Sequence, residues 1–117
     1  MTLVSIITPA YNCKNTIKGT YDSVLSQTFK DWEWIIVDDC SKDDSFSLLK
    51  ELEKKEKRII VLQTPKNGGS AAARNIALKH ATGKYVTFLD SDDVIDPNYI
   101  EEQVKYIKDN AINLCRI

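Results

Sequence analysis

Short apolar runs alternate along this chain with longer segments in which apolar residues recur every three or four positions. The short runs lie at residues 3–8, 34–37, 59–62 and 85–89, and their β-branched and aromatic content predicts strands. The last of these runs carries no charge after Lys84, which is typical of a strand buried in a sheet. Pro9 is expected to end the first strand, because proline cannot donate a backbone hydrogen bond.

The segments between the strands show helical spacing of their apolar residues. They predict a helix after a cap at Asn15 or Thr16, a second from about Asp43 or Asp44, a third over 71–81 and a fourth over 97–110. Asp96 would cap the fourth helix, and Pro97 would fill its first position. The apolar residues at 112–117 permit a fifth strand.

Strands that alternate with helices over short connections specify a parallel sheet with helices on both faces, joined by right-handed crossovers. The predicted fold is therefore α/β and Rossmann-like, and 117 residues fit one domain. Ligands of such sheets bind outside the carboxyl ends of the strands. Polar segments follow all four strands, at residues 9–12, 38–39, 67–74 and 90–93, so we expect the functional site at that edge.

Three carboxylates, Asp90, Asp92 and Asp93, follow the fourth strand within four residues. Like charges this close repel unless a cation neutralises them, and hard divalent ions such as Mg²⁺ and Mn²⁺ prefer oxygen ligands. The alternative is local, since Asp and Ser are ordinary turn and capping residues. Asp96 already serves as the cap of the next helix, however, and leaves the other three carboxylates unexplained.

Three other residues at this edge suit a nucleotide. Tyr11 offers an aromatic face on which a base can stack, or it packs within its own loop. Asp39 follows the second strand, where a carboxylate can accept a base N–H or a ribose hydroxyl, or it opens the next turn together with Asp38. Arg74 lies in the first or second turn of a helix, where the macrodipole disfavours a cation. We therefore expect an anion beside Arg74, either a diphosphate or a carboxylate.

Composition narrows the function classes. The net charge of −1, from 16 basic and 17 acidic residues, provides no general field for nucleic acid, so we expect no nucleic-acid partner. Three scattered cysteines and a single histidine argue against zinc, and the glycines form neither a dinucleotide fingerprint nor a P-loop. With reduced thiols and no long apolar span, the protein is expected to be cytoplasmic, and attachment to the inner face of the membrane is left to regions outside this chain.

The motifs occur in a definite order, at residues 4–12, 26–29, 36–41, 67–69, 73–75 and 83–85, with an Asp-x-Asp signature at 90–92. In this order and spacing they resemble the nucleotide-sugar-binding half of the family 2 glycosyltransferases, which have the GT-A fold. The resemblance spans almost the whole chain. It implies transfer of a sugar from a nucleotide-diphosphate sugar, commonly a UDP-sugar, to a hydroxyl acceptor in glycan or polysaccharide synthesis.

The resemblance also implies roles for the matching residues. These are Pro9, Ala10 and Tyr11 around the base, Asp39 on the base N–H, Arg74 by the base or diphosphate, Asp90 on the ribose or a metal-bound water, and Gly68 and Ser91 among the remaining nucleotide contacts. Asp92 would be the direct ligand of Mn²⁺ or Mg²⁺, with Asp90 beside it. The ion would neutralise the diphosphate as the glycosidic bond breaks.

Only 24 residues follow Asp93. Enzymes of the family continue into an acceptor-binding half. The resemblance implies an inverting transfer, in which a carboxylate base of that half deprotonates the acceptor hydroxyl. We therefore expect residues 1–117 to form one nucleotide-sugar-binding domain of a truncated catalytic domain, with the contacts to a glycan or lipid-linked acceptor lying elsewhere. The base is expected to lie elsewhere too, and Asp93 is the remaining candidate within this chain. An uncovered sheet edge would favour a homodimer.

Two other interpretations stay open at this point. The chain could be a nucleotide-binding module that transfers no sugar. Residues 90–94 also fit the D-x-D-x-[TV] pattern of haloacid-dehalogenase-like phosphatases, in which Asp90 would be the nucleophile. In that family, however, the motif follows the first strand and needs a Lys and further acids downstream.

Overall fold

The computed structural model describes residues 2–109, in which strands and helices alternate as the sequence predicts. The elements are β1 (Val4–Ala10), α1 (Ile17–Leu25), β2 (Trp32–Asp38), α2 (Ser45–Lys55), β3 (Ile59–Gln63), α3 (Ser70–His80), β4 (Tyr85–Phe88) and α4 (Tyr99–Asp109). The fifth strand expected at 112–117 lies outside the described residues.

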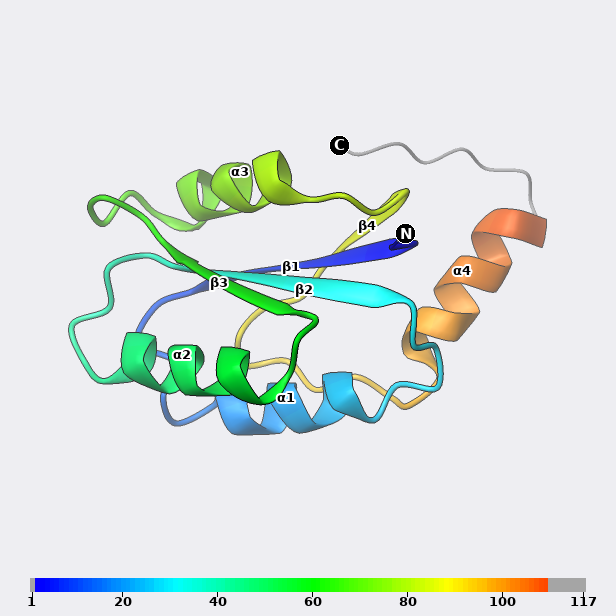
Figure 1. The fold of residues 1–117 in the computed structure, drawn as a ribbon, viewed down its shortest axis with the longest axis horizontal. Helices are drawn as coiled ribbons and strands as arrows, with labels where there is room; N and C mark the ends of the chain where they lie inside the picture. The colour runs from blue at the N-terminus through cyan, green and yellow to red at the C-terminus, as the bar shows by residue number, and fades with distance from the viewer. Residues whose placement is uncertain (1, 110–117) are drawn as a thin grey trace.

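The four described strands form one parallel sheet in the order β3-β2-β1-β4 (Figure 1). The strand order reverses at β1, because β2 and β3 lie on one side of it and β4 on the other. Val4 of β1 is in register with Trp32 of β2 and Tyr85 of β4. The loops that follow all four strands consequently emerge at one edge, as expected for an α/β sheet.

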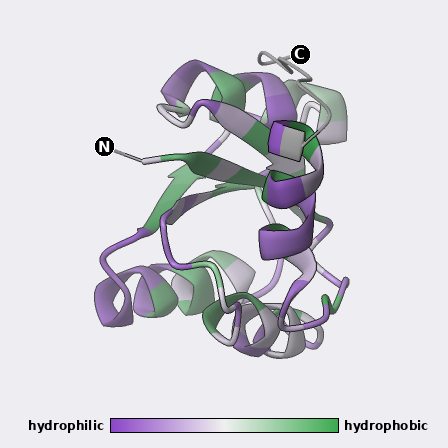
Figure 2. Ribbon diagram, turned by 90° about the vertical axis from the view of Figure 1, so that its right-hand side faces the viewer, coloured by the Kyte–Doolittle hydropathy of each residue, from purple (hydrophilic) through white to green (hydrophobic). Residues whose placement is uncertain are grey.

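Alternate residues of the central strands enter two separate cores. Ile6, Trp34 and Ile36 face α1, α2 and the first turns of α4, whereas Ile7 and Ile35 face α3. Figure 1 shows α1 and α2 below the sheet and α3 above it. In Figure 2 the strands are largely apolar, while the helices carry long polar stretches. The prediction of helices on both faces is confirmed.

Pro9 does not end β1, contrary to the prediction, since the strand continues to Ala10. Hydrogen bonds alternate between the two neighbours of β1. The Ala10 carbonyl accepts from Asp39 after β2 at 2.8 Å, and the Ile7 carbonyl accepts from Leu89 after β4 at 2.9 Å. The nitrogen of Pro9 therefore faces the β4 side, where the pairing of β1 ends at Ile7, so that no donor is required there.

The prediction that residues 84–89 form a strand buried in the sheet is wrong for part of this run. Phe88 is 40% exposed, and Val86 and Thr87 are only half-buried. The reason is the strand order, because β4 lies at an edge of the described sheet. The fourth helix also differs from its prediction. It begins at Tyr99 after a turn through Pro97, rather than at Pro97 itself.

Candidate functional site

A cleft of about 500 Å³ opens where the loops after β1 and β4 meet the start of α3. Its walls are formed by Pro9, Tyr11, Asn12, Cys13, Thr16, Ser70, Arg74, Asp90, Ser91 and Asp92. Six of these residues were predicted from the sequence as site residues, namely Pro9, Tyr11, Arg74, Asp90, Ser91 and Asp92. The structure therefore brings together residues that are up to 83 positions apart in the chain, since Pro9 and Asp92 share the cleft.

Tyr11 presents its ring from a loop whose backbone is fixed. The side chain is 42% exposed. Its neighbour Asn12 has a φ of 50°, in the left-handed region that Asn tolerates better than most residues. The Asn12 N–H donates to Ser41 Oγ at 2.9 Å, and Asn12 Oδ1 accepts from the Lys42 N–H at 3.0 Å. These bonds join the loop after β1 to the loop after β2, and the ring of Tyr11 stays available to a ligand.

Asp39 is buried below the cleft and is bound by the start of α3. Its carboxylate accepts from the N–H of Gly68 at 2.9 Å, from the N–H of Gly69 at 2.7 Å and from the Thr64 hydroxyl at 2.9 Å. Burial works against ionisation of Asp39, but these hydrogen bonds outweigh it and hold the pKa of the carboxyl below its usual range. Asp39 therefore does more than open a turn, which is the role of Asp38 through its bond from the Ser41 N–H.

Three residues predicted to contact the nucleotide do not line the cleft. Ala10 and Asp39 are almost completely buried, and Gly68 donates its N–H to the Asp39 carboxylate without lining the cleft. Ala10 accepts a backbone hydrogen bond from Asp39 at 2.8 Å, so that these two residues support the floor next to Tyr11. A ligand can bond to Asp39 only at acceptor positions of the carboxylate that the protein's own donors leave unused.

Arg74 lies in the second turn of α3 and faces the loop after β4. Its Nη2 atom is 3.7 Å from Oδ1 of Asp90, and both side chains are substantially exposed. A pair at this distance and exposure stabilises the fold little. Of the two anions expected beside Arg74, the structure shows the carboxylate. The guanidinium keeps most of its donors free for a second anion.

Asp90, Asp92 and Asp93 form an exposed group of carboxylates. One ligand oxygen from each lies within 4.8 Å of the others. The loop is tightly turned here, because the Asp93 N–H donates to the Asp90 carbonyl at 3.1 Å and the Asp90 N–H donates to Asp93 Oδ2 at 3.2 Å. Oxygen ligands in an open site suit Mg²⁺ or Mn²⁺, which keep room for water and phosphate oxygens. The donor set therefore fits the predicted divalent ion.

Four lining residues, Asn12, Cys13, Thr16 and Ser70, were not individually predicted as site residues, although Asn12 and Ser70 lie within the polar segments 9–12 and 67–74 expected at this edge. Ser70 had a signal, since it follows Gly68 and Gly69 at the start of a predicted helix. Cys13 had none. Burial, together with the nearby charges of Asp38 and Asp43, raises the pKa of the Cys13 thiol, so that it is a neutral part of the wall.

A separate apolar groove of about 390 Å³ lies between β4 and α4, with Tyr85, Tyr99 and Val104 among its walls. It contains none of the predicted site residues. No helix in the described part of the chain has the length and hydrophobicity needed to cross a bilayer.

Residues 5–117 match the model of the family "Glycosyl transferase family 2". This chain belongs to that family. The match extends from β1 through the carboxylates after β4, so that the cleft lies within the family domain. Family 2 membership leaves the phosphatase interpretation of residues 90–94 without support.

A curated family 2 relative is the UDP-Glc:alpha-D-GlcNAc-diphosphoundecaprenol beta-1,3-glucosyltransferase WfaP of Escherichia coli. It is 46% identical over 112 residues, which are 96% of this chain and 44% of that protein. The chain spans less than half the length of the curated relatives that it matches.

Solved structures show the same fold. TarS of S. aureus (residues 1–349) in complex with UDP-GlcNAc superposes with a TM-score of 0.87 at 33% identity, over 94% of this chain and 32% of that one. The mannosyltransferase PcManGT of Pyrobaculum calidifontis, in complex with GDP-Man and Mn²⁺, gives 0.83 at 27% identity, over 89% and 32%. The predicted Rossmann-like GT-A fold is confirmed.

Proposed function

We propose that this chain is the nucleotide-sugar-binding part of an inverting glycosyltransferase that moves a sugar from a UDP-sugar to a hydroxyl acceptor in glycan or polysaccharide synthesis. The observation that carries the proposal is the convergence in one cleft of an exposed aromatic ring, an arginine and two carboxylates, Asp90 and Asp92, with the carboxylate of Asp93 next to them. Support for the donor comes from WfaP, whose name specifies UDP-glucose, and from TarS, whose structure holds UDP-GlcNAc.

The base is proposed to lie against Tyr11, between Pro9, Ala10 and the loop after β2. Stacking on Tyr11 supplies affinity for any base, and Asp39 supplies selectivity by accepting a base N–H. An ionised carboxylate has about four acceptor positions. Protein donors use three of those on Asp39, which leaves one for the ligand. The low pKa of Asp39 keeps it an acceptor at neutral pH.

The diphosphate is proposed to lie between Arg74 and the carboxylates. Arg74 offers its free donors to phosphate oxygens, and Ser91 completes the contacts in the cleft. Gly68, which does not line the cleft, is proposed to act through its hydrogen bond to Asp39. Asp92, with Asp90 beside it, would hold Mn²⁺ or Mg²⁺. When bound, the ion supplies Lewis-acid stabilisation of the departing diphosphate. PcManGT supports this assignment, because it was solved with Mn²⁺.

The acceptor is proposed to be a glycan or lipid-linked hydroxyl compound, met at the inner face of the membrane. WfaP supports this class, since its name specifies a diphosphoundecaprenol-linked sugar. The catalytic base is proposed to lie outside residues 1–117, with Asp93 as the candidate inside them. A homodimer through the exposed edge of β4 stays a prediction. A transfer assay separates this proposal from a binding module that transfers no sugar.

Calorimetric titration with UDP tests the donor site. We expect the wild-type chain to bind UDP more tightly in Mn²⁺ than in a chelator, because the metal links the carboxylates to the diphosphate. Asp92→Asn should abolish this difference. Asp96→Asn is the matched control, since its carboxylate lies outside the metal-binding group, and it should behave as the wild type. Equal affinity of wild type and Asp92→Asn in Mn²⁺ would refute the metal assignment.

A further inference from the structure

The carboxylate loop (residues 90–96) is held near its start by Thr20 of α1 and at its end by Gln27, two residues beyond the end of α1. Near its start, the Thr20 hydroxyl donates to the Ser91 carbonyl at 3.0 Å. At its end, the Gln27 amide donates to the Asp96 carbonyl at 2.7 Å. The residues joined by these bonds are 71 and 69 positions apart in the sequence. Thr20 lies within α1, whereas Gln27 follows the C-cap residue Ser26.

Both donors are completely buried, so water cannot replace their bonds. Gln27 uses every polar atom of its side chain. Its nitrogen also donates to the Ser23 carbonyl at 3.0 Å, and its oxygen accepts from the Ile100 N–H at 3.0 Å. Gln27 thus holds the start of α4 as well as the end of the carboxylate loop. The Thr20 side chain makes no bond to α4. Among the described residues, its hydroxyl donates only to the Ser91 carbonyl in the carboxylate loop.

Thr20 bonds to the carboxylate loop directly between the two residues proposed to hold the metal. Ser91 lies between Asp90 and Asp92, and its carbonyl belongs to the peptide unit that leads into Asp92. Fixing that carbonyl fixes the plane of the peptide unit that ends at the Asp92 Cα, and so restrains the position from which the Asp92 side chain extends. On the other side, the Leu89 N–H bond to the Ile7 carbonyl fixes the entry into Asp90.

We propose that Thr20 is a positioning residue for the divalent metal site, acting on Asp92 through the Ser91 carbonyl. The inference rests on the proposed function, because it assumes that Asp92 holds the ion. Groups that orient metal ligands typically change metal affinity about 10- to 100-fold when they are lost. The loop keeps its internal bonds between Asp90 and Asp93, so we expect the lower end of that range, about 10-fold.

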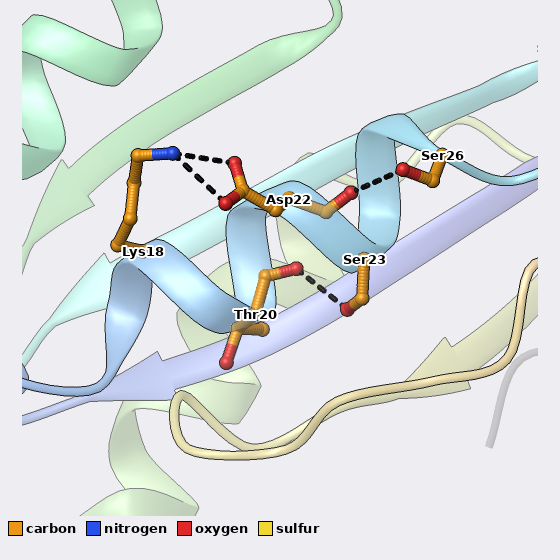
Figure 3. A network of polar contacts seen from close by, with 5 residues as sticks. All are labelled: Lys18, Thr20, Asp22, Ser23 and Ser26. Atoms are coloured by element: carbon orange, nitrogen blue, oxygen red, sulfur yellow. Dashed lines mark hydrogen bonds and ion pairs between the residues drawn. The ribbon is translucent and has the colours of Figure 1, made fainter.

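The chain offers a matched control on the same helix. Ser23 is also buried, and its hydroxyl donates at 2.8 Å to the Thr20 carbonyl, a bond that stays within α1. Figure 3 shows this bond, and shows the Thr20 hydroxyl pointing away from the other four labelled residues. Thr20→Val and Ser23→Ala each remove one buried hydroxyl, but only the first removes a contact to the carboxylate loop.

The test measures Mn²⁺ binding by electron paramagnetic resonance on the full 117-residue chain, in the absence of nucleotide. We expect Thr20→Val to weaken Mn²⁺ about 10-fold, and Ser23→Ala and Thr20→Ser to bind as the wild type does. Amide hydrogen exchange without metal gives a second measurement. Exchange at Asp92 and Asp93 should accelerate in Thr20→Val and not in Ser23→Ala. If Thr20→Val fails to fold, Thr20→Ala takes its place, because it also removes the hydroxyl but places no methyl group against the Ser91 carbonyl.

The outcomes separate the two claims. The role of Thr20 would be overturned if the wild type and Thr20→Val bound Mn²⁺ with equal affinity. It would also be overturned if amide exchange at Asp92 and Asp93 were equal in Thr20→Val and Ser23→Ala. Either result would leave the proposed function standing. No Mn²⁺ binding by the wild-type chain, with normal exchange protection, would overturn the metal site and the role of Thr20 with it.

Discussion

The carboxylate of Asp39, just beyond the end of β2, accepts a hydrogen bond of 2.7 Å from the backbone N–H of Gly69, immediately before α3. Gly69 has a φ of 91°, a conformation that side-chain-bearing residues rarely adopt. The acceptor and the strained backbone together set the direction in which α3 begins, and α3 carries Arg74 into the cleft. A buried carboxylate therefore couples the side of the site proposed to hold the base to the side proposed to hold the diphosphate.

Replacing Asp39 should lower the free energy of unfolding at neutral pH and weaken the dependence of that free energy on pH. The pKa of Asp39 is lowered in the folded protein, so its stabilising effect is complete above the unfolded value, about 3.9, and is lost as the pH falls through the folded value. We expect Asp39→Asn to cost about 1.5–3 kcal/mol at pH 7, because hydrogen bonds to a charged group are lost. The difference from wild type should shrink as the pH falls below about 4.

Urea unfolding between pH 7 and pH 3 measures both effects. Asp22→Asn is the control, since Asp22 is an exposed carboxylate on α1 that pairs only with Lys18 among the salt bridges of the described residues. Its unfolding free energy should run parallel to that of the wild type. A constant difference between Asp39→Asn and wild type at every pH would show that the Asp39 charge does not stabilise the fold.

Replacing Tyr11 should weaken all nucleotides by a similar factor. Loss of the stacking surface in Tyr11→Ala is expected to reduce affinity about 5- to 150-fold, the range that stacking on one aromatic ring covers. The control is Tyr106→Ala on α4, an exposed tyrosine that does not line the cleft. Calorimetry with UDP, CDP and GDP measures the effect. A loss confined to UDP would show that Tyr11 reads the base instead of stacking on it.

Two glycines should respond to alanine in opposite directions. A Cβ at Gly83 would lie 2.6 Å from Ser5 Oγ and 2.9 Å from the Val4 carbonyl carbon, whereas a Cβ at Gly19 would meet only Val94 Cγ2 at 3.7 Å. Gly83→Ala should therefore destabilise the fold by about 1–3 kcal/mol through overpacking against β1. Gly19→Ala should stabilise α1 by about 0.5–1 kcal/mol, because alanine loses less backbone entropy.

Thermal and urea unfolding of the two variants measure these changes against one wild type. If Gly83→Ala is as stable as the wild type, then β1 and the turn before β4 can move apart without a loss of stability. Destabilisation by Gly19→Ala would mean that α1 has no room beside Val94 in solution.

Much of the fold could be predicted because its signals are local. Four apolar runs separated by helical spacing are enough for a parallel sheet, and a parallel sheet places the polar segments after its strands at one edge. Tyr11, Arg74 and Asp92 therefore met in one cleft as predicted. The exposure of Phe88 was missed because it depends on which strand lies at the edge.

The contacts that stabilise the site could not be predicted, because their partners are distant in sequence. Pro9 continues its strand only because the pairing of β1 with β4 stops before it. The sequence motif at 26–29 suggests nothing more than the end of a helix. In the structure, its Gln27 is buried and bonded to the loop after β4. Nothing in the sequence distinguishes Thr20 from other helical residues, because its hydrogen-bond partner Ser91 lies 71 positions later in the chain.

Nuclear magnetic resonance of the ¹⁵N-labelled chain during titration with UDP and Mg²⁺ tests the nucleotide site most directly, because it locates the ligand residue by residue. The account predicts shifts of the amide signals of Tyr11 and Asp92, which line the cleft, and of Asp39 and Gly69, which are bonded to each other next to it, together with their neighbours. Shifts confined to the groove between β4 and α4, at Tyr85 and Tyr99, or unchanged spectra at saturating UDP, would contradict it.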